Sequence, residues 1–321
     1  KLSMDRFDNP HYVFDALLNK IDVDRYLPSS PAEETVQPAA EPEEPLDLSF
    51  LKTIRIDGNF RIGELKIYNV KASLIKVGMK ARGGTILVSP ITASLYKGRL
   101  KGTLKVNAVR TPRISLQQDL KEINVGPLMR DALSKDFLEG KGNISLNVNG
   151  AGNTVGAIKK SLSGTAKAEL RDGAIKGINI ARTIRVAQSK LGLLKGEQAQ
   201  AAAATEQTDF SELKAVFTIK NGVAHDDLIA KSPLIRLEGK GDIYIAEEKL
   251  DYLMKATIVG TLEGQEGKDL ADLRGLTIPI RANGPFSDPE FKLDFNAMAG
   301  ETAKQKAQQK LKEGLKKLFK R

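Results

Sequence analysis

The chain has 321 residues, of which 41% are hydrophobic and 28% are charged, and its formal net charge is +10. This composition excludes a wholly disordered chain, and no apolar run reaches the roughly 18 residues that a membrane-spanning helix needs. The chain has no cysteine, which excludes disulfides and thiolate metal sites but leaves the compartment open.

The first 45 residues predict a domain boundary. The chain begins at Lys1 with no leader, so we expect a fragment whose signal or anchor lies upstream. Residues 28–45 hold five prolines and five glutamates, a composition that favours an extended, exposed linker. We interpret residues 1–27 as the end of a preceding domain, with helical spacing over 11–19, and residues 46–300 as the main β domain.

The main domain alternates apolar and polar residues with period two. In the stretch 100–108, Leu100, Leu104 and Val106 face one way while Lys101 and Lys105 face the other. About ten such segments recur along the chain, which predicts a mainly β (α+β) fold with a few short helices. We expect an extended, curved antiparallel sheet that forms either a groove or a sandwich.

Glycines give the expected turns and close approaches. Asp57-Gly58, Asp172-Gly173 and Asn221-Gly222 predict tight hairpins, because such pairs adopt the positive φ angles that these turns require. Glycines within strands, at 102, 239 and 241, indicate bulges, strong curvature or a place where another group approaches the sheet closely.

Helical spacing predicts four further helices. They lie at about 127–137, 155–162, 181–194 and in the tail. The loop GAGNTVG at Gly150 precedes the second of these helices. Its third glycine comes one place late for a dinucleotide loop, so we interpret it as a strand-to-helix turn.

Catalytic and metal-binding motifs are missing from the sequence. His225 is followed by Asp226 and Asp227, but adjacent strand residues point to opposite faces and no second histidine lies nearby, so we interpret this stretch as a surface loop. The other histidine is His11. We therefore expect a protein that is not an enzyme and has no cofactor or bound metal.

The tail, residues 301–321, carries eight basic residues against two acidic ones, a local charge of +6. Its apolar residues follow helical spacing, which predicts a basic amphipathic helix that either contacts an anionic membrane or a partner, or is simply solvated. With 5% aromatic residues and no tryptophan, we expect no binding of nucleic acid. The candidate contact residues are Lys310, Leu311, Leu315, Lys316, Lys317 and Phe319.

Five segments in order carry a family resemblance over nearly all of residues 46–300. They are SLYKGRLKGTLKV from Ser94, FLEGKGNISLNVNGAG from Phe137, SLSGTAKAELRDGAIKGINI from Ser161, TDFSELKAVFTIKNGVAHDDLIAKSPLIRLEGKGDI from Thr208, and LTIPIRANGPFSDPEFKLD from Leu276. Together they resemble the C-terminal half of members of the AsmA family. The resemblance implies a periplasmic protein tethered to the inner membrane, associated with outer-membrane biogenesis and phospholipid movement, and similar to bridge-like lipid-transfer proteins. It supplies no catalytic residues.

Two functions follow as expectations. The first is non-enzymatic binding or conduction of phospholipid, or another envelope lipid, between the inner and outer membranes, with a membrane surface and envelope proteins as partners. The second is a structural factor that influences outer-membrane protein assembly without carrying lipid. For the first, the apolar strand faces are the lipid-facing candidates: Leu104, Val106, Leu146, Val148, Leu237, Ile243, Ile245 and Ile258.

Overall fold

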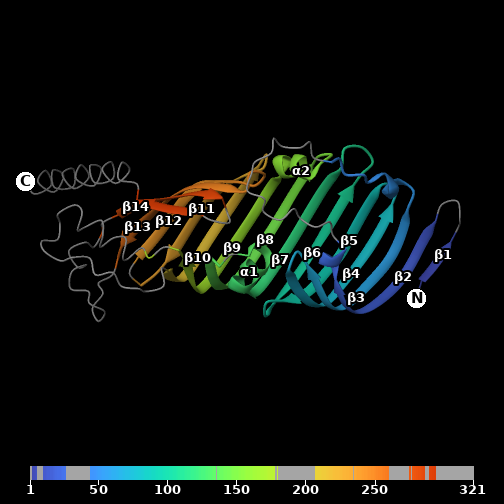
Figure 1. Ribbon diagram of the computed structural model, residues 1–321, viewed down its shortest axis with the longest axis horizontal. Helices are drawn as coiled ribbons and strands as arrows, with labels where there is room; N and C mark the ends of the chain where they lie inside the picture. Colours follow the sequence, from blue (N-terminus) through green and yellow to red (C-terminus); the bar gives the residue numbers. More distant parts are fainter. Residues whose placement is uncertain are drawn as a thin grey trace, which may run out of the picture.

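The computed structural model describes residues 2–5, 10–26, 44–134, 136–177, 179, 207–233, 235–259, 275, 277–285 and 289–293. Within this part of the chain, fifteen strands form one sheet in which they lie side by side in chain order (Figure 1). The strands are β1 (Leu2–Asp5), β2 (His11–Asp22), β3 (Arg55–Ile67), β4 (Val70–Arg82), β5 (Thr85–Leu95), β6 (Gly98–Asn107), β7 (Arg113–Asn124), β8 (Leu138–Ala151), β9 (Ser163–Lys176), β10 (Gln207–Lys220), β11 (Val223–Lys231), β12 (Ile235–Tyr244), β13 (Lys249–Ile258), β14 (Thr277–Pro285) and β15 (Glu290–Leu293). In the same described residues four short helical segments accompany them: η1 (Val23–Arg25), η2 (Ser49–Lys52), α1 (Val125–Leu133) and α2 (Val155–Ser161).

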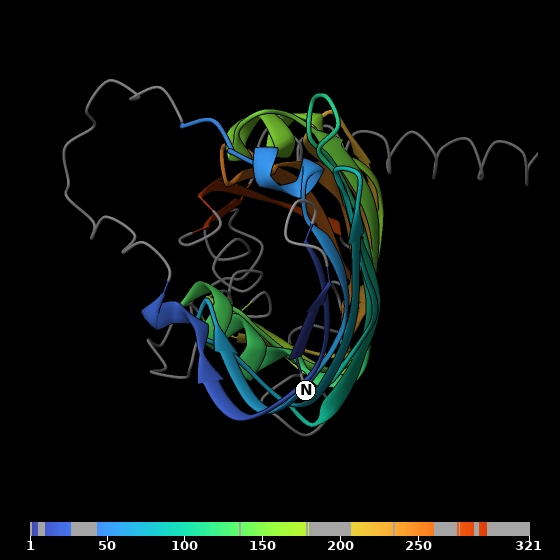
Figure 2. The same ribbon diagram turned by 90° about the vertical axis from the view of Figure 1, so that its right-hand side faces the viewer.

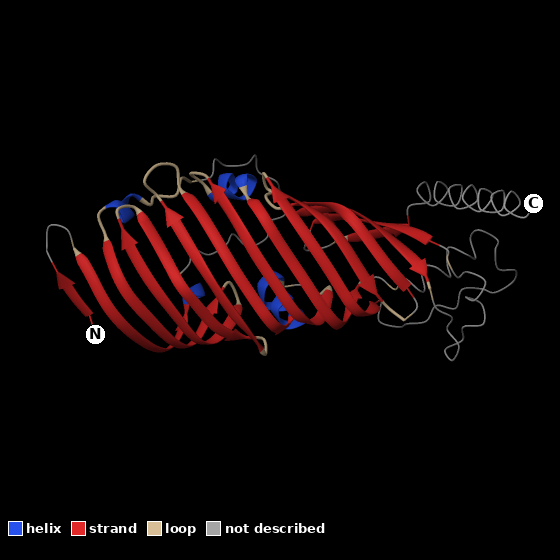
Figure 3. Ribbon diagram, turned by 180° about the vertical axis from the view of Figure 1, so that it is seen from behind, coloured by secondary structure: helices blue, strands red, loops and turns tan. Residues whose placement is uncertain are grey.

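The sheet is an open, curved trough. Neighbouring strands are antiparallel except β2 and β3, which are parallel. Viewed along its long axis, the sheet has a C-shaped section, with α1 at one rim and α2 and η2 at the other (Figure 2). From behind, the strands lie side by side across the convex face (Figure 3). The expected curved antiparallel sheet is confirmed, and because the strands form one sheet rather than two facing sheets, it forms a groove.

Irregular pairing helps to bend the strands. Register shifts occur between β4 and β5, β5 and β6, β7 and β8, and β8 and β9. An extra residue in one strand bends that strand and increases its twist. Three of the shifts, at Ser73/Lys76, Leu120/Ile123 and Glu139/Lys141, lie toward the strand ends on the side of α1.

Of the three Asx-Gly hairpins predicted from the sequence, the described structure contains one. Asn221 and Gly222, with φ of 48° and 76°, connect β10 to β11 as predicted. The other two predictions are wrong. Gly58 lies inside β3 beneath the ring of Phe14, and Asp172, with φ of 49°, lies inside β9 opposite the register shift with β8. At Asp172 the positive φ belongs to a bulge within the strand rather than to a turn between strands.

The helix predictions are partly confirmed. Residues 125–133 and 155–161 are helical, and Thr154 caps α2 by accepting a hydrogen bond from the Ala157 amide at 3.1 Å, so the loop after Gly150 is a strand-to-helix turn. Residues 11–19 are not a helix but part of β2, because pairing with β3 satisfies their backbone groups. The predicted helices at 181–194 and in the tail lie outside the described residues.

The expected domain boundary does not interrupt the sheet. β2, from the segment 1–27, pairs directly with β3, from the main domain, along most of its length. Of the expected linker, residues 28–43 lie outside the described part. No described helix has both the length and the apolar character needed to cross a membrane.

Candidate functional site

The concave face of the sheet is apolar. In β6, Lys101 and Lys105 are exposed, while Leu104 and Val106 point to the other face and are partly covered. The helix α1 lies within the curve of the sheet (Figure 2), and its Leu128 packs against the core formed by this other face. The apolar face is therefore the inside of the groove.

Strand register arranges these inner side chains in rows, because paired residues on neighbouring strands point to the same face. One row, called here the apolar row, has an apolar residue or glycine at every position from β2 to β13. Its members are Phe14, Gly58, Met79, Val88, Leu104, Leu116, Val148, Gly164, Ile219, Ala224, Ile243 and Leu250. With about 4.8 Å between strands, the apolar row runs roughly 50 Å along the groove.

A second row contains two side chains that break the apolar pattern. This mixed row consists of Ala16, Phe60, Val77, Ile91, Gly102, Gln118, Leu146, Ala166, Phe217, Asp226, Gly241, Tyr252 and Ala282. Gln118 Oε1 and Asp226 Oδ1 are both buried and have no hydrogen-bond partner in the described structure. The groove floor therefore carries two acceptor oxygens without a hydrogen-bond partner among the described residues, one on β7 and one on β11.

Asp226 lies in the covered part of the floor and is 7% exposed. Its Oδ2 accepts a hydrogen bond from the Tyr252 hydroxyl at 2.5 Å. Burial raises the pKa of Asp226 to about 6, although the bond from Tyr252 acts in the opposite direction. Burial and the neighbouring carboxylate also raise the pKa of Tyr252. The ring of Tyr252 fits over Gly239 and Gly241, where an added Cβ would lie 2.4 and 2.5 Å from it, so the predicted close approach at these glycines is confirmed.

Accessibility changes along the groove. On β5 to β7, inner residues such as Val88, Leu104 and Leu116 remain partly exposed. On β12 to β14, Leu237, Ala256 and Ile278 are 0–3% exposed and belong to the main hydrophobic core. The β5 to β7 part of the floor is thus open to a ligand, whereas on β12 to β14 the positions of Leu237, Ala256 and Ile278 are covered and Ile243 and Leu250 are partly exposed.

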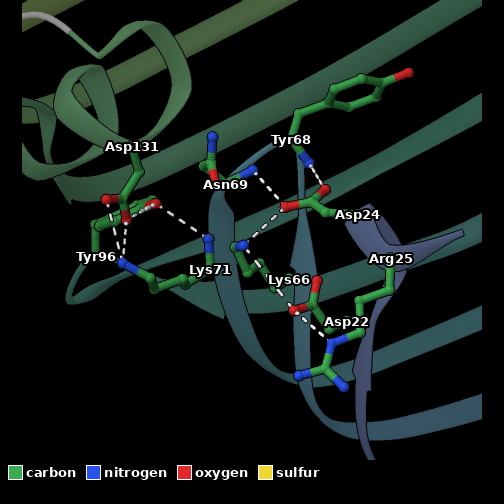
Figure 4. Close-up of polar contacts among 9 residues, drawn as sticks. All are labelled: Asp22, Asp24, Arg25, Lys66, Tyr68, Asn69, Lys71, Tyr96 and Asp131. Atoms are coloured by element: carbon green, nitrogen blue, oxygen red, sulfur yellow. Dashed lines mark hydrogen bonds and ion pairs between the residues drawn. The ribbon is translucent and has the colours of Figure 1, made fainter. Parts of the chain in front are cut away.

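A polar network joins the elements of the rim near α1 (Figure 4). Asp24, in η1, accepts the backbone N–H groups of Tyr68 and Asn69 in the β3–β4 turn, the latter at 3.0 Å, and pairs with Lys66 at 3.2 Å. These contacts, the Asn69 bond above all, lower the pKa of Asp24. They tie the end of β2 to the neighbouring hairpin.

The same rim holds α1 against the sheet. The Tyr96 hydroxyl donates to Asp131 of α1 at 2.7 Å and accepts from the Lys71 amide at 3.1 Å (Figure 4). The Lys71 ammonium lies 3.2 Å from the same carboxylate. Burial raises the pKa of Tyr96 to about 12. Beside this network lies a pocket of about 820 Å³ formed by β2 to β6 and η1.

The structure places the eight lipid-facing candidates on or against the inner face. Leu104, Val148 and Ile243 lie in the apolar row and Leu146 in the mixed row, while Val106 pairs with Ile114 beside them. Leu237 and Ile258 are each 3% exposed in the main core, and Ile245, just after β12, packs against the cluster around Val148. The tail candidates Lys310, Leu311, Leu315, Lys316, Lys317 and Phe319 lie outside the described residues.

Sequence reasoning missed the polar positions of the groove. The stretch 225–227 is not a surface loop but part of β11, with His225 and Asp227 exposed and Asp226 buried between them. The alternation of Ala224, Asp226 and Leu228 could have revealed it, because Asp226 falls in the apolar phase. Among the described residues, no cluster of three or more His, Cys, Asp or Glu side chains could hold a metal ion.

Comparison with known proteins gives one family and one curated relative. The protein-family model described as "AsmA family" matches residues 29–228 of this chain. Protein AsmA of Escherichia coli (strain K12) is 24% identical over 236 residues, a match that covers 73% of this chain. The chain spans 37% of that relative's length. No solved structure matches the chain.

Proposed function

Because the chain belongs to the AsmA family, we propose that its groove binds the acyl chains of phospholipids and forms part of a path for lipid between the inner and outer membranes of a bacterial envelope. The protein acts in the periplasm, tethered to the inner membrane, and catalyses no reaction. The apolar row carries this proposal, since it has an apolar residue or glycine at every position from β2 to β13 and its members on β5 to β7 are partly exposed.

The physical basis is the hydrophobic effect. Moving one methylene from water to an apolar surface contributes about 0.8 kcal/mol, so an acyl chain gains several kcal/mol by lying on the partly exposed residues of β5 to β7. Because every position of the apolar row has similar chemistry, a chain that shifts by one strand exchanges one apolar contact for another. Binding without a polar barrier along the row favours movement over fixed capture.

The experiment is to quantify phospholipid that co-purifies with the chain, by native mass spectrometry of the parent and of Leu104→Asp. Leu104 is partly exposed on the groove floor, so a carboxylate there stays hydrated once lipid leaves. We expect Leu104→Asp to keep the melting temperature of the parent within a few degrees and to lose its lipid.

Lys105→Asp is the matched control, because Lys105 is the next residue of β6 and points to the convex face. It should retain the lipid of the parent. Equal lipid content in all three proteins would contradict the groove as the binding surface. A parent that never carries lipid would favour the second function, a structural role in outer-membrane protein assembly.

A further inference from the structure

The rim pocket is strongly basic. Its volume of about 820 Å³ lies in the range typical of small-molecule sites. Two acidic residues, Asp22 and Glu64, line it, and the pocket lining as a whole has a formal charge of +4. Its basic residues are Lys20, Arg25, Lys66, Lys71, Lys97 and Arg99.

Four of these cations already have carboxylate partners. Lys20 pairs with Glu64 at 2.9 Å and Arg25 with Asp22 at 3.5 Å, while Lys66 and Lys71 take part in the network described above. Lys97 and Arg99 have no ion-pair partner in the part of the chain that the structure describes. The unbalanced positive charge of the pocket therefore comes from these two side chains.

The local backbone places the two free cations together. Tyr96 and Lys97, with φ of 47° and 67°, form the two-residue turn that connects β5 to β6. Lys97, in the turn, and Arg99, at the start of β6, flank Gly98, and both line the pocket. They can therefore contact one anion jointly.

The pocket is also lined by apolar residues that lead to the core of the groove. Ile21 pairs with Leu65, which pairs with Ala72. At the other side of the pocket, the Cα of Gly98 lies so close to Ile123 that an added Cβ would be 2.5 Å from its Cγ2. Ile123 is fully buried in the main core. A ligand that matches this lining has both an anionic and an apolar part.

We propose that the rim pocket binds the phosphate group of a phospholipid headgroup, with Lys97 and Arg99 as its charge-assisted hydrogen-bond donors, while the acyl chains lie in the groove. This inference rests on the proposed function and adds a headgroup site to it. A phosphate there gains two cationic partners that have no carboxylate to give up.

Binding of three soluble probes to the purified chain tests the site, with calorimetry at low salt as the readout. The probes are dihexanoyl phosphatidylglycerol, dihexanoylglycerol, which lacks the phosphate, and inorganic phosphate. The variant is the double charge reversal Lys97→Glu with Arg99→Glu. The control is Lys76→Glu with Lys80→Glu, two exposed lysines of β4 outside the pocket.

We expect the Lys97/Arg99 variant to bind the phospholipid at least about tenfold more weakly, a change of about 1.4 kcal/mol, and to bind dihexanoylglycerol as the parent does. The control should match the parent for both lipids. Because both side chains are exposed, the variant should fold. If it does not, the pair Lys97→Gln and Arg99→Gln provides the same comparison.

Each other outcome overturns part of the account. Equal weakening of both lipids, or of neither, would refute the phosphate site and leave the groove as a lipid-binding surface. Inorganic phosphate could bind the parent as tightly as the phospholipid does, and lose affinity by the same factor in the Lys97/Arg99 variant. That result would show a simple anion site and refute the lipid assignment. A parent that binds neither lipid would refute the proposed function and this inference with it.

Discussion

The Tyr252 hydroxyl on β13 donates to Asp226 Oδ2 on β11 at 2.5 Å across Gly241 of the intervening strand β12, and the second oxygen of this carboxylate is buried without a hydrogen-bond partner among the described residues. The pair lies in the mixed row, where the other residues are apolar or glycine except for Gln118. Burial favours the protonated form of this acid and raises its pKa to about 6. This relationship makes the stability of the groove depend on pH.

Asp226 should make the protein more stable in mild acid. Its pKa is about 6 in the folded state against 3.8 as the ordinary value, so the folded protein binds more protons between these limits. The free energy of unfolding therefore falls as the pH rises from about 4 to above 6, by up to about 3 kcal/mol at 1.36 kcal/mol per pH unit. Urea unfolding of the parent and of Asp226→Asn between pH 4 and 8 measures the effect. The variant should lose this pH dependence, and identical pH profiles would show that Asp226 does not cause it.

Tyr96→Phe should loosen α1 from the rim. The substitution removes the bonds to Asp131 and to the Lys71 amide, which we expect to lower the free energy of unfolding by about 1–3 kcal/mol. Tyr68→Phe is the control, because the Tyr68 side chain is 67% exposed. Denaturant unfolding measures the free energy of unfolding of both variants. An equal decrease in Tyr96→Phe and Tyr68→Phe would contradict the assigned role of Tyr96.

Gly142→Ala should destabilise the sheet strongly. A Cβ at this position would lie 1.9 Å from the Glu169 carbonyl oxygen, which is backbone and cannot rotate away. We expect a loss of about 2 kcal/mol or more, since overpacking forces the neighbouring strand to move. Ser145→Ala, on the same strand, should change the melting temperature little. A Gly142→Ala protein as stable as the parent would show that β8 and β9 are not held at this spacing.

The basic tail should bind anionic vesicles weakly and with a strong dependence on salt. Its local charge of +6 is screened beyond about 10 Å at ~0.1 M salt. Vesicle flotation of the whole chain and of a chain lacking residues 301–321 tests this. Unchanged binding at low salt after the deletion would exclude the tail as the membrane contact.

Local sequence patterns predict the strands well but not the way they assemble. The alternation in residues 100–108 is the same whether the apolar face meets a second sheet or an open groove, so the pattern alone favours the more common sandwich, and the family resemblance is what points to a groove. Pairing with a strand distant in the sequence also determines that β2 is a strand and not a helix. The adjacent Leu17 and Leu18 gave helical spacing, but pairing with β3 makes the segment a strand and leaves Leu17 75% exposed.

The site was predictable where it is apolar and not where it is polar. Leu104 and Ile243 were expected on the lipid-facing side because of their period, and the structure places both in the apolar row. Turns formed by residues such as Tyr96 and Lys97 carry no Asx-Gly signal, so the basic pocket beside them was missed. Its residues come from five strands, and only the fold brings them together.

The central claim, that acyl chains lie on the groove floor, is tested most directly by photo-crosslinking. A photoreactive phenylalanine analogue is placed at Leu104, at Ile243 or at Lys105, and lipid attached to each protein is identified by mass spectrometry after illumination of cells that make it. Crosslinks to phospholipid at positions 104 and 243, with none at 105, are the predicted result. Equal labelling at 105, or no lipid at 104 and 243, would contradict the account.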